Sequence, residues 1–416
     1  MATDTKVVQL EKRNSTPPPT DSDDTMPEIR HIDGDLPNVI DQTITAVATL
    51  GDHGCFVFAN RLHRIHAAHL PEKGDVCRPA GAVRLYPVDA THFAELATKT
   101  GRHFRWDRRS EDWRLMNCPR RVAEAALARG HWPTFPHLTG IIETPSLTAA
   151  GKLIDKPGFH SSGLYLTERP SNYKSPSAMP SIAEARAAAD RLKEVFSTFP
   201  FVNEADGAAA VAAIMTALNR RSMPSAPMVA ITAPTPGTGK SLIADIVAMM
   251  ALGRRGAMLA LGDDEAETEK RLYSALLAGD GLLIADNVEM PLRGVLLCQL
   301  LTQPVVQFRP LGFSTLVTAP TNTTMVATGN NLAIAGDLRR RVMLIRLDAQ
   351  TERPESRAFV RDAMAYVRER RGTLICDALT VTLAYFAAGQ PNVGVRPYGG
   401  FEQWDLMVRR PLIWVG

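Results

Sequence analysis

Short apolar runs alternate with longer helix-like segments through the second half of the chain. The runs lie at 228–232, 281–285, 325–328 and 342–347, and each is long enough for one buried strand. Strands that alternate with helices in this way are typical of a parallel sheet covered by helices on both faces. The pattern therefore predicts an α/β domain with three layers over residues 228–350.

Helical periodicity flanks this region on both sides. Residues 181–199 carry apolar positions about every 3.6 residues, and residues 208–218 are apolar almost all round, which predicts a buried helix. Residues 354–388 also have a helical pattern. We expect a helical collar over 181–227 and a helical lid over 351–416.

The N-terminal part of the chain has a mixed pattern. Residues 1–36 are polar and carry several prolines, so we expect a disordered tail there. Residues 37–180 combine short strand-like runs with helical stretches at 90–98 and 121–129, which predicts a smaller α+β domain. The Pro- and Ser-rich residues 168–180 are expected to link this domain to the helical segment that begins at residue 181.

Composition narrows the class of protein only a little. The chain has 416 residues, of which 45% are hydrophobic and 22% charged, and its formal net charge is +3. These values fit a soluble globular protein and exclude collagen-like, coiled-coil and wholly disordered chains. Five cysteines without a CxxC pair favour a reduced, cytoplasmic protein. No apolar run approaches the ~20 residues of a membrane span, so we expect no membrane association.

The chemically most informative stretch is APTPGTGKSLIADIVAMMALG, at 233–253. A strand, a glycine loop and a helix follow one another in the order that a phosphate-binding P-loop requires. Its loop would curl around phosphate, its lysine would reach the β- and γ-phosphates of ATP, and its serine would ligate Mg²⁺. The consensus GxxxxGK[ST] has glycine where this chain has Pro234. The predicted nucleotide-binding residues are Pro236, Gly237, Thr238, Gly239, Lys240, Ser241 and Leu242.

A second element, GLLIADNV at 281–288, predicts a buried strand that carries Asp286 to the carboxyl edge of the sheet. There Asp286 would complete an Mg²⁺ site with Ser241. Many P-loop ATPases place a glutamate directly after this aspartate as catalytic base, whereas this chain has Asn287, with Glu289 two residues further on. Asparagine cannot abstract a proton. Three alternatives stay open: Asn287 only orients water, Glu289 supplies the carboxylate, or hydrolysis is slow.

A third element, at 323–348, predicts two strands with polar groups between them. The first strand ends at Asn330, whose amide can hold the attacking water or the γ-phosphate. Three consecutive arginines precede the second strand, and Arg340 or Arg341 is suited to act as a finger on the γ-phosphate of a neighbouring subunit. The alternative is a solvated or anion-binding turn.

Basic and aromatic side chains are interleaved over residues 101–121, the mix that single-strand binders use for phosphates and bases. The predicted phosphate contacts there are Arg105, Arg108 and Arg109. The alternative is an amphipathic surface whose tryptophans lie in the core. Residues 307–320 predict a hairpin, either a pore loop with Arg309 as its phosphate contact or an ordinary edge hairpin.

The set PGTGKS, LLIADNV, ATGNN and GDLRRR resembles the AAA+ ATPase domain of superfamily-3-type helicases. More narrowly, it is similar to the helicase-like part of phage and plasmid primase–helicase proteins, over roughly residues 120–416. The resemblance implies an AAA+ ATPase core at 228–350 that uses ATP and Mg²⁺. It also implies a homo-hexameric ring that binds single-stranded DNA in its pore and translocates along it.

The first hypothesis is therefore an ATP-dependent DNA translocase or helicase that replicates a phage, plasmid or integrated mobile element. An alternative is a slowly hydrolysing ATP switch that loads a replicative helicase or a primase onto DNA, which Pro234 and Asn287 favour. A third, weaker hypothesis is a P-loop sensor in defence against invading elements.

Overall fold

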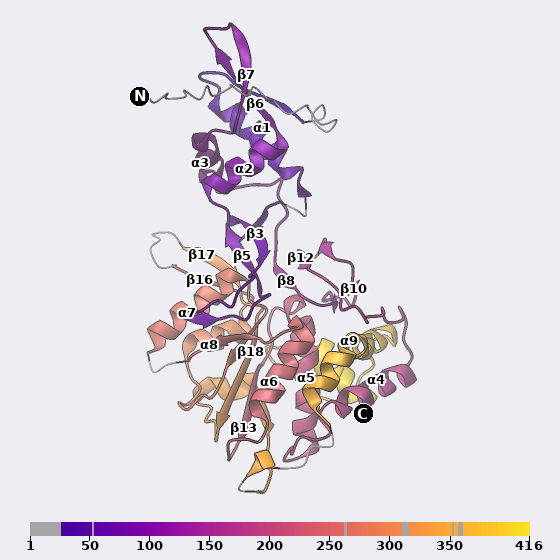
Figure 1. The fold of residues 1–416 in the computed structure, drawn as a ribbon. Coiled ribbons are helices and arrows are strands. Elements are labelled where there is room, and N and C mark those ends of the chain that lie inside the picture. Colours follow the sequence, from indigo (N-terminus) through magenta and orange to yellow (C-terminus); the bar gives the residue numbers. More distant parts are fainter. Residues whose placement is uncertain (1–25, 52–53, 262–263, 310–315, 352, 357–360) are drawn as a thin grey trace, which may run out of the picture. The chain divides into compact units, whose positions relative to one another are not determined.

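The computed structural model describes residues 26–51, 54–261, 264–309, 316–351, 353–356 and 361–416 (Figure 1). The chain divides into two compact units. Unit 1 contains the residues up to Leu50 and those from Asp89 to Arg129, whereas unit 2 contains Gly51–Val88 and Gly130–Gly416. The predicted 37–180 domain therefore has residues in both units. Within the described ranges, no helix has both the length and the apolar character needed to span a bilayer.

The described residues of unit 1 form a three-stranded sheet of order β1-β6-β7 with three helices. Strands β1 and β6 are parallel, and β6 and β7 form an antiparallel hairpin. Ile29 of β1 and His103 of β6 are fully buried beneath the helices, and the His103 Nε2 lies 3.2 Å from the Ala97 carbonyl oxygen of α2. The elements are β1 (Glu28–His31), α1 (Leu36–Ala48), α2 (Ala90–Thr100), β6 (Arg102–Asp107), β7 (Asp112–Met116) and α3 (Arg120–Ala128).

The centre of unit 2 is a sheet whose described strands have the order β19-β13-β18-β15-β14-β4. All neighbouring pairs are parallel except β14 and β4. The chain is thus a mixed α/β protein with a central, mostly parallel sheet, and the four predicted strands are confirmed. The strands are β4 (Val76–Cys77), β13 (Met228–Ala233), β14 (Ala257–Leu259), β15 (Leu282–Ala285), β18 (Thr324–Asn330) and β19 (Val342–Arg346).

Helices cover both faces of this sheet (Figure 1). The connection β13–α6–β14 moves across the sheet in one direction, and β14–α7–β15 returns in the other. Because such crossovers are right-handed, α6 lies on one face and α7 on the opposite face. The helices are α6 (Lys240–Leu252), α7 (Glu265–Ala278) and α8 (Val295–Thr302).

The remaining helices of unit 2 pack together beside α6. Helix α4 begins with a capping box, in which Ser181 and Glu184 satisfy each other's backbone N–H groups, and it packs along α9. Helix α5 is buried almost all round, as its apolar sequence predicts, and it packs against α6. The helices are α4 (Ile182–Glu194), α5 (Glu204–Asn219), α9 (Ala363–Ala387), α10 (Glu402–Trp404), a π-helical turn (Asp405–Arg409) and α11 (Arg410–Val415).

Smaller sheets complete unit 2. The predicted hairpin at 307–320 is present as the antiparallel pair β16–β17, and the expected turn at 310–312 lies outside the described residues. The small sheets have the orders β2-β3-β5, β11-β12-β8 and β10-β9. Their strands are β2 (Phe56–Phe58), β3 (Arg61–Ala67), β5 (Val83–Pro87), β8 (Gly140–Ile142), β9 (Ser146–Leu147), β10 (Leu153–Ile154), β11 (Gly158–Phe159), β12 (Leu164–Leu166), β16 (Val305–Phe308) and β17 (Val317–Pro320).

A buried ion pair fixes the 51–88 segment to the main sheet. Arg78 follows β4 directly, and its Nε and Nη2 donate to the Asp280 carboxylate at 2.9 and 2.5 Å. Both side chains are only 6% exposed. Burial lowers the pKa of the Arg78 guanidinium, and hydrogen bonding to Asp280 raises it. The pKa is raised overall. The segment is therefore an integral part of the unit 2 core.

Candidate nucleotide site

The loop between β13 and α6 contains two glycines in the left-handed region of backbone conformation. Gly237 and Gly239 have φ angles of 73° and 101°, which are unfavourable for residues other than glycine. A Cβ atom at Gly239 would also lie 3.0 Å from the Phe199 ring. Pro236, Gly237 and Leu242 are exposed and Thr238 is buried, so the predicted binding residues lie in a partly exposed loop and in the first turn of α6. The backbone N–H groups of such a helix start favour an anion.

Lys240 lies at the first position of α6 and is only 8% exposed. Its Nζ donates to the Thr235 carbonyl oxygen at 3.0 Å and to the Thr238 Oγ1 at 3.3 Å. Burial lowers the pKa of this ammonium, and the nearby Asp286 carboxylate raises it. Both hydrogen-bond partners are neutral, so the positive charge of Lys240 is directed at the loop without a contacting counter-ion among the described residues.

Asp286 follows β15 and meets the P-loop helix, as the parallel arrangement requires. The Ser241 Oγ donates to the Asp286 Oδ1 at 2.8 Å, and the Thr328 hydroxyl of β18 donates to the same oxygen. Hard cations such as Mg²⁺ prefer hydroxyl and carboxylate oxygens of this kind. The donor set of Ser241 and Asp286 therefore fits Mg²⁺. The sequence pattern did not single out Thr328, whose hydroxyl orients this carboxylate.

Asn287 and Glu289 lie next to each other beside Asp286. Asn287 has a left-handed φ of 52°, and its backbone N–H donates to the Thr328 Oγ1 at 3.1 Å. Its side-chain amide donates to the Glu289 Oε1 at 3.3 Å. Both side chains are exposed. The asparagine thus holds the carboxylate of Glu289 at the same edge of the sheet as Asp286.

Asn330 ends β18, which lies between the P-loop strand and the strand of Asp286. Its exposed amide is therefore carried to the edge between Lys240 and Asp286. The following residue, Asn331, ties this edge together, because its backbone N–H donates to the Ala233 carbonyl oxygen at 2.9 Å.

Arg340 and Arg341 lie at the other end of the sheet. Val342, which follows them, pairs with Met228 at the start of β13. Because β13 has 6 residues, at roughly 3.3 Å each the P-loop is about 20 Å away. Both arginines pair with Asp337, but Arg340 is 71% exposed and Arg341 only 15%. Neither can reach the P-loop of its own chain, and Arg340 is the more accessible to another molecule.

One charged residue close to the site, Asp245, is not among the residues that the sequence motifs predicted. Asp245 is one turn beyond Ser241 on α6. Burial raises its pKa, Arg255 lowers it, Asp286 raises it further, and Arg368 of α9 lowers it. Helix α6 therefore carries a second carboxylate close to Ser241, and the Arg255 Nε lies 3.5 Å from its Oδ2. A charge at i+4 from the P-loop serine is the only signal in the sequence that could have identified Asp245.

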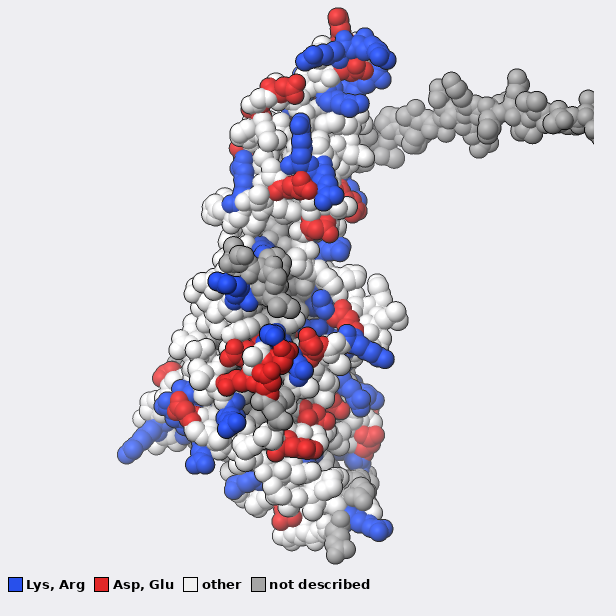
Figure 2. Space-filling view, turned by 90° about the vertical axis from the view of Figure 1, so that its left-hand side faces the viewer, with Lys and Arg blue, Asp and Glu red and all other residues white. Residues whose placement is uncertain are grey.

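The predicted nucleic-acid contacts lie on two hairpins. Arg105 is on β6, and Arg108 and Arg109 are in the β6–β7 turn of unit 1, where basic side chains gather among acidic ones (Figure 2). Arg309 directly follows β16 of unit 2, and all four arginines are exposed. The alternative of core tryptophans in 101–121 is wrong, because Trp106 is 48% exposed.

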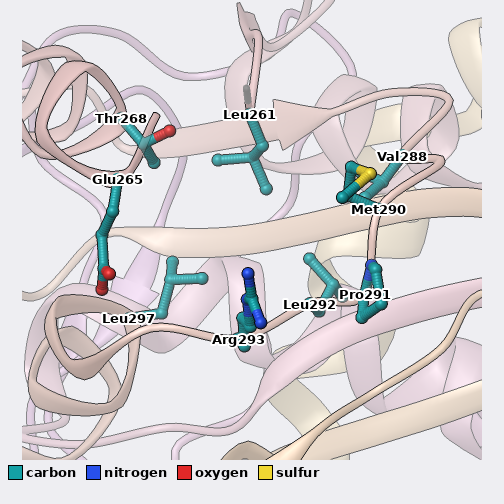
Figure 3. Close-up of a pocket in the computed structure, with 9 residues that line it drawn as sticks. All are labelled: Leu261, Glu265, Thr268, Val288, Met290, Pro291, Leu292, Arg293 and Leu297. Atoms are coloured by element: carbon teal, nitrogen blue, oxygen red, sulfur yellow. The ribbon is translucent and has the colours of Figure 1, made fainter. Parts of the chain in front are cut away.

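A small pocket lies beside the nucleotide site but is separate from its P-loop. It is lined by the loop 288–293 together with Leu261 and side chains of α7 and α8 (Figure 3). Its charged lining residues are Glu265 and Arg293. No residue of the P-loop contributes to this pocket, so the described geometry does not connect it with phosphate.

No protein-family model matches this chain, and no curated protein matches it. A solved structure described as the apo structure of the NrS-1 C-terminal region is similar over 78% of this chain and 75% of its own, at 12% identity and a TM-score of 0.37. A structure described as the X-ray structure of JCV helicase is similar over 56% of this chain and 66% of its own, at 14% identity and a TM-score of 0.25.

Proposed function

We propose that unit 2 is a P-loop ATPase of the AAA+ type. The observation that carries the proposal is the meeting of Lys240, Ser241, Asp286 and Asn330 at one edge of a mostly parallel sheet. Ammonium, hydroxyl, carboxylate and amide groups at a glycine loop are the parts that phosphoryl transfer needs. The strand order supports this assignment because the carboxyl ends of β13, β15 and β18, which are distant in sequence, lie at one edge of the sheet.

Each side chain has a role that follows from its position. Lys240 binds the β- and γ-phosphates of ATP, for which its charge has no contacting protein counter-ion in the described ranges. Ser241 and Asp286 hold Mg²⁺, which when bound neutralises charge on the phosphate oxygens. Asn330 orients the attacking water, and Glu289, held by Asn287, accepts its proton.

Arg340 is proposed to complete the site of a neighbouring subunit. Its distance from the P-loop of its own chain excludes a role in cis, and its exposure leaves it accessible. A finger supplied in trans requires an assembly in which the start of β19 of one subunit faces the P-loop of the next. A homo-hexameric ring satisfies this condition, with Arg341 and Asp337 supporting the finger.

For the whole chain we propose an ATP-dependent DNA translocase or helicase of a phage, plasmid or integrated mobile element. The motif resemblance supports this proposal, together with the hairpin β16–β17 and the exposed Arg309 that follows β16 as a contact for single-stranded DNA. A second candidate is the slow ATP switch that loads a partner helicase or primase. One observation favours it: the residue directly after Asp286 is an amide, not an acid.

Steady-state ATP hydrolysis with and without single-stranded DNA separates these two functions. A translocase is expected to hydrolyse ATP at about 1–100 s⁻¹ with clear stimulation by DNA, in the range typical of phosphoryl-transfer enzymes. A switch is expected to bind ATP tightly and to turn over negligibly in both conditions. Stimulated turnover followed by a strand-separation assay would establish the motor, and unstimulated, negligible turnover would reject it.

Glu289→Gln is expected to lower kcat by about 100-fold and to leave ATP affinity unchanged, because the amide cannot accept the proton of the attacking water. Phosphate release and binding of a fluorescent ATP analogue measure the two quantities separately. Glu369→Gln, an exposed carboxylate on α9, is the matched control. If Glu289→Gln retains full turnover, Glu289 is not the base.

A further inference from the structure

The sheet of unit 1 has one face covered by helices and one face left open by them. Alternate residues of a strand point to opposite faces. The helix-covered face carries Ile29 and His103, both fully buried. A Cβ at Gly101 would lie 2.9 Å from Ile29 and 3.6 Å from Ala46 of α1, which shows how closely this side is packed. The opposite face carries the intervening residues of β1, β6 and β7.

Aromatic side chains gather on this open face. Trp106 of β6 pairs in register with Trp113 of β7, and their rings meet edge to face with centroids 5.6 Å apart. Phe104 lies two residues before Trp106, opposite Leu115. Trp106 is 48% exposed and Leu115 is 62% exposed, and neither Phe104 nor Trp113 is buried. A soluble surface rarely carries such a patch without a binding role.

Arginines are placed among these rings. The Arg30 guanidinium of β1 lies 5.4 Å from the Trp113 ring centroid, and that of Arg102 lies 5.3 Å from the Phe104 centroid. One carboxylate, that of Glu28, pairs with Arg30 at 3.2 Å on the same face. Arg108 and Arg109 in the β6–β7 turn add positive charge at the end of the face. Arg105 belongs to the helix-covered side of β6, so it is not part of this surface.

We infer that the open face of Arg30, Arg102, Phe104, Trp106 and Trp113 binds single-stranded nucleic acid. Exposed rings across two strands offer stacking surfaces for two or three bases, as in sheet-based single-strand binders. The guanidinium groups neutralise the phosphates between those bases. Charge complementarity selects a polyanion as occupant over an apolar protein surface. This site goes beyond the proposed ATPase, because it lies in unit 1 and requires no nucleotide.

The test measures binding by the full chain, without ATP, to fluorescein-labelled dT20 and rU20 oligonucleotides by fluorescence anisotropy. Trp106→Ala is expected to raise Kd by about 5- to 100-fold, the loss of one stacked base, and Trp106→Phe to restore most of the affinity. Arg102→Gln is expected to raise Kd and reduce its salt dependence. Arg120→Gln is the matched control, since this arginine of α3 is 75% exposed. Circular dichroism verifies that each variant is folded.

The two oligonucleotides and two further variants decide the remaining outcomes. Stronger binding of dT20 or of rU20 identifies DNA or RNA as the preferred strand. Equal binding means that the site recognises the bases and phosphates that both strands contain. Lys240→Ala is expected to retain this binding, so a failure of the ATPase proposal leaves the inference standing. If Trp106→Ala and Arg102→Gln bind like wild type while Arg309→Ala loses binding, the hairpin of unit 2 carries the contact and the inference is wrong.

Discussion

Lys240→Ala is expected to lower ATP turnover by at least about 100-fold, the largest effect on activity that the structure predicts. The Lys240 ammonium is buried at the start of α6, and its hydrogen bonds go to the neutral oxygens of Thr235 and Thr238. A buried cation whose partners are neutral gains strongly from an anionic phosphate. In the alanine variant this charge no longer stabilises the bound nucleotide or the transition state, so ATP affinity should fall as well.

The measurements are phosphate release at saturating ATP and titration with a fluorescent ATP analogue. Lys174→Ala removes an exposed lysine of unit 2 and serves as the control, with both quantities expected at the wild-type level. Equal turnover in Lys240→Ala and wild type would remove the P-loop from the mechanism and, with it, the ATPase proposal.

Asp280→Ala is expected to lower the free energy of unfolding of unit 2 by about 3–5 kcal/mol, the largest effect on stability. Asp280 accepts hydrogen bonds from both Nε and Nη2 of Arg78, and both side chains are almost fully buried. Removing the carboxylate leaves the buried guanidinium with Glu72 as its remaining ionic partner, 3.6 Å away and partly exposed. This longer contact does not replace the hydrogen bonds to Asp280, so a poorly compensated charge stays buried, which costs more than the loss of the pair itself.

Urea unfolding followed by circular dichroism measures this change. Glu267→Ala breaks an exposed pair with Lys270 on the neighbouring α7 and is expected to cost less than about 1 kcal/mol. The double variant Arg78→Met with Asp280→Leu replaces both charges by apolar groups and is expected to recover most of the loss. A single variant Asp280→Ala with wild-type stability would contradict the buried-pair argument.

The parts of the fold that could be predicted from sequence are those with a local pattern. The strands β13, β15, β18 and β19 are short apolar runs, and each is confirmed within a residue or two. The meeting of Ser241 with Asp286 follows from one rule, that the carboxyl ends of parallel strands share an edge. The catalytic roles of these residues, the 181–227 collar and the 351–416 lid stay predictions.

The parts that could not be predicted depend on contacts between distant residues. Strand β4 has two residues, too few for any periodicity, and its partner Met258 lies about 180 positions further along the chain. The exposure of Trp106 depends on which face of a short sheet the helices cover, and the sequence of β6 alone does not determine that face. Asp245 was not predicted from any motif. It lies near the site because it is one turn beyond Ser241 on α6.

The edge strand β4 also determines where this protein can be cut. Residues 51–88 belong to unit 2, although in sequence they lie between the two segments of unit 1. Within them, β4 pairs with the outer edge of β14. Deleting everything before residue 130 would expose the unpaired backbone of β14, an edge that can pair with another chain. The same deletion would leave Asp280 buried without Arg78. A fragment that carries the candidate nucleotide site therefore requires residues 51–88 to be retained, for example by deleting residues 1–50 and replacing residues 89–129 with a short linker.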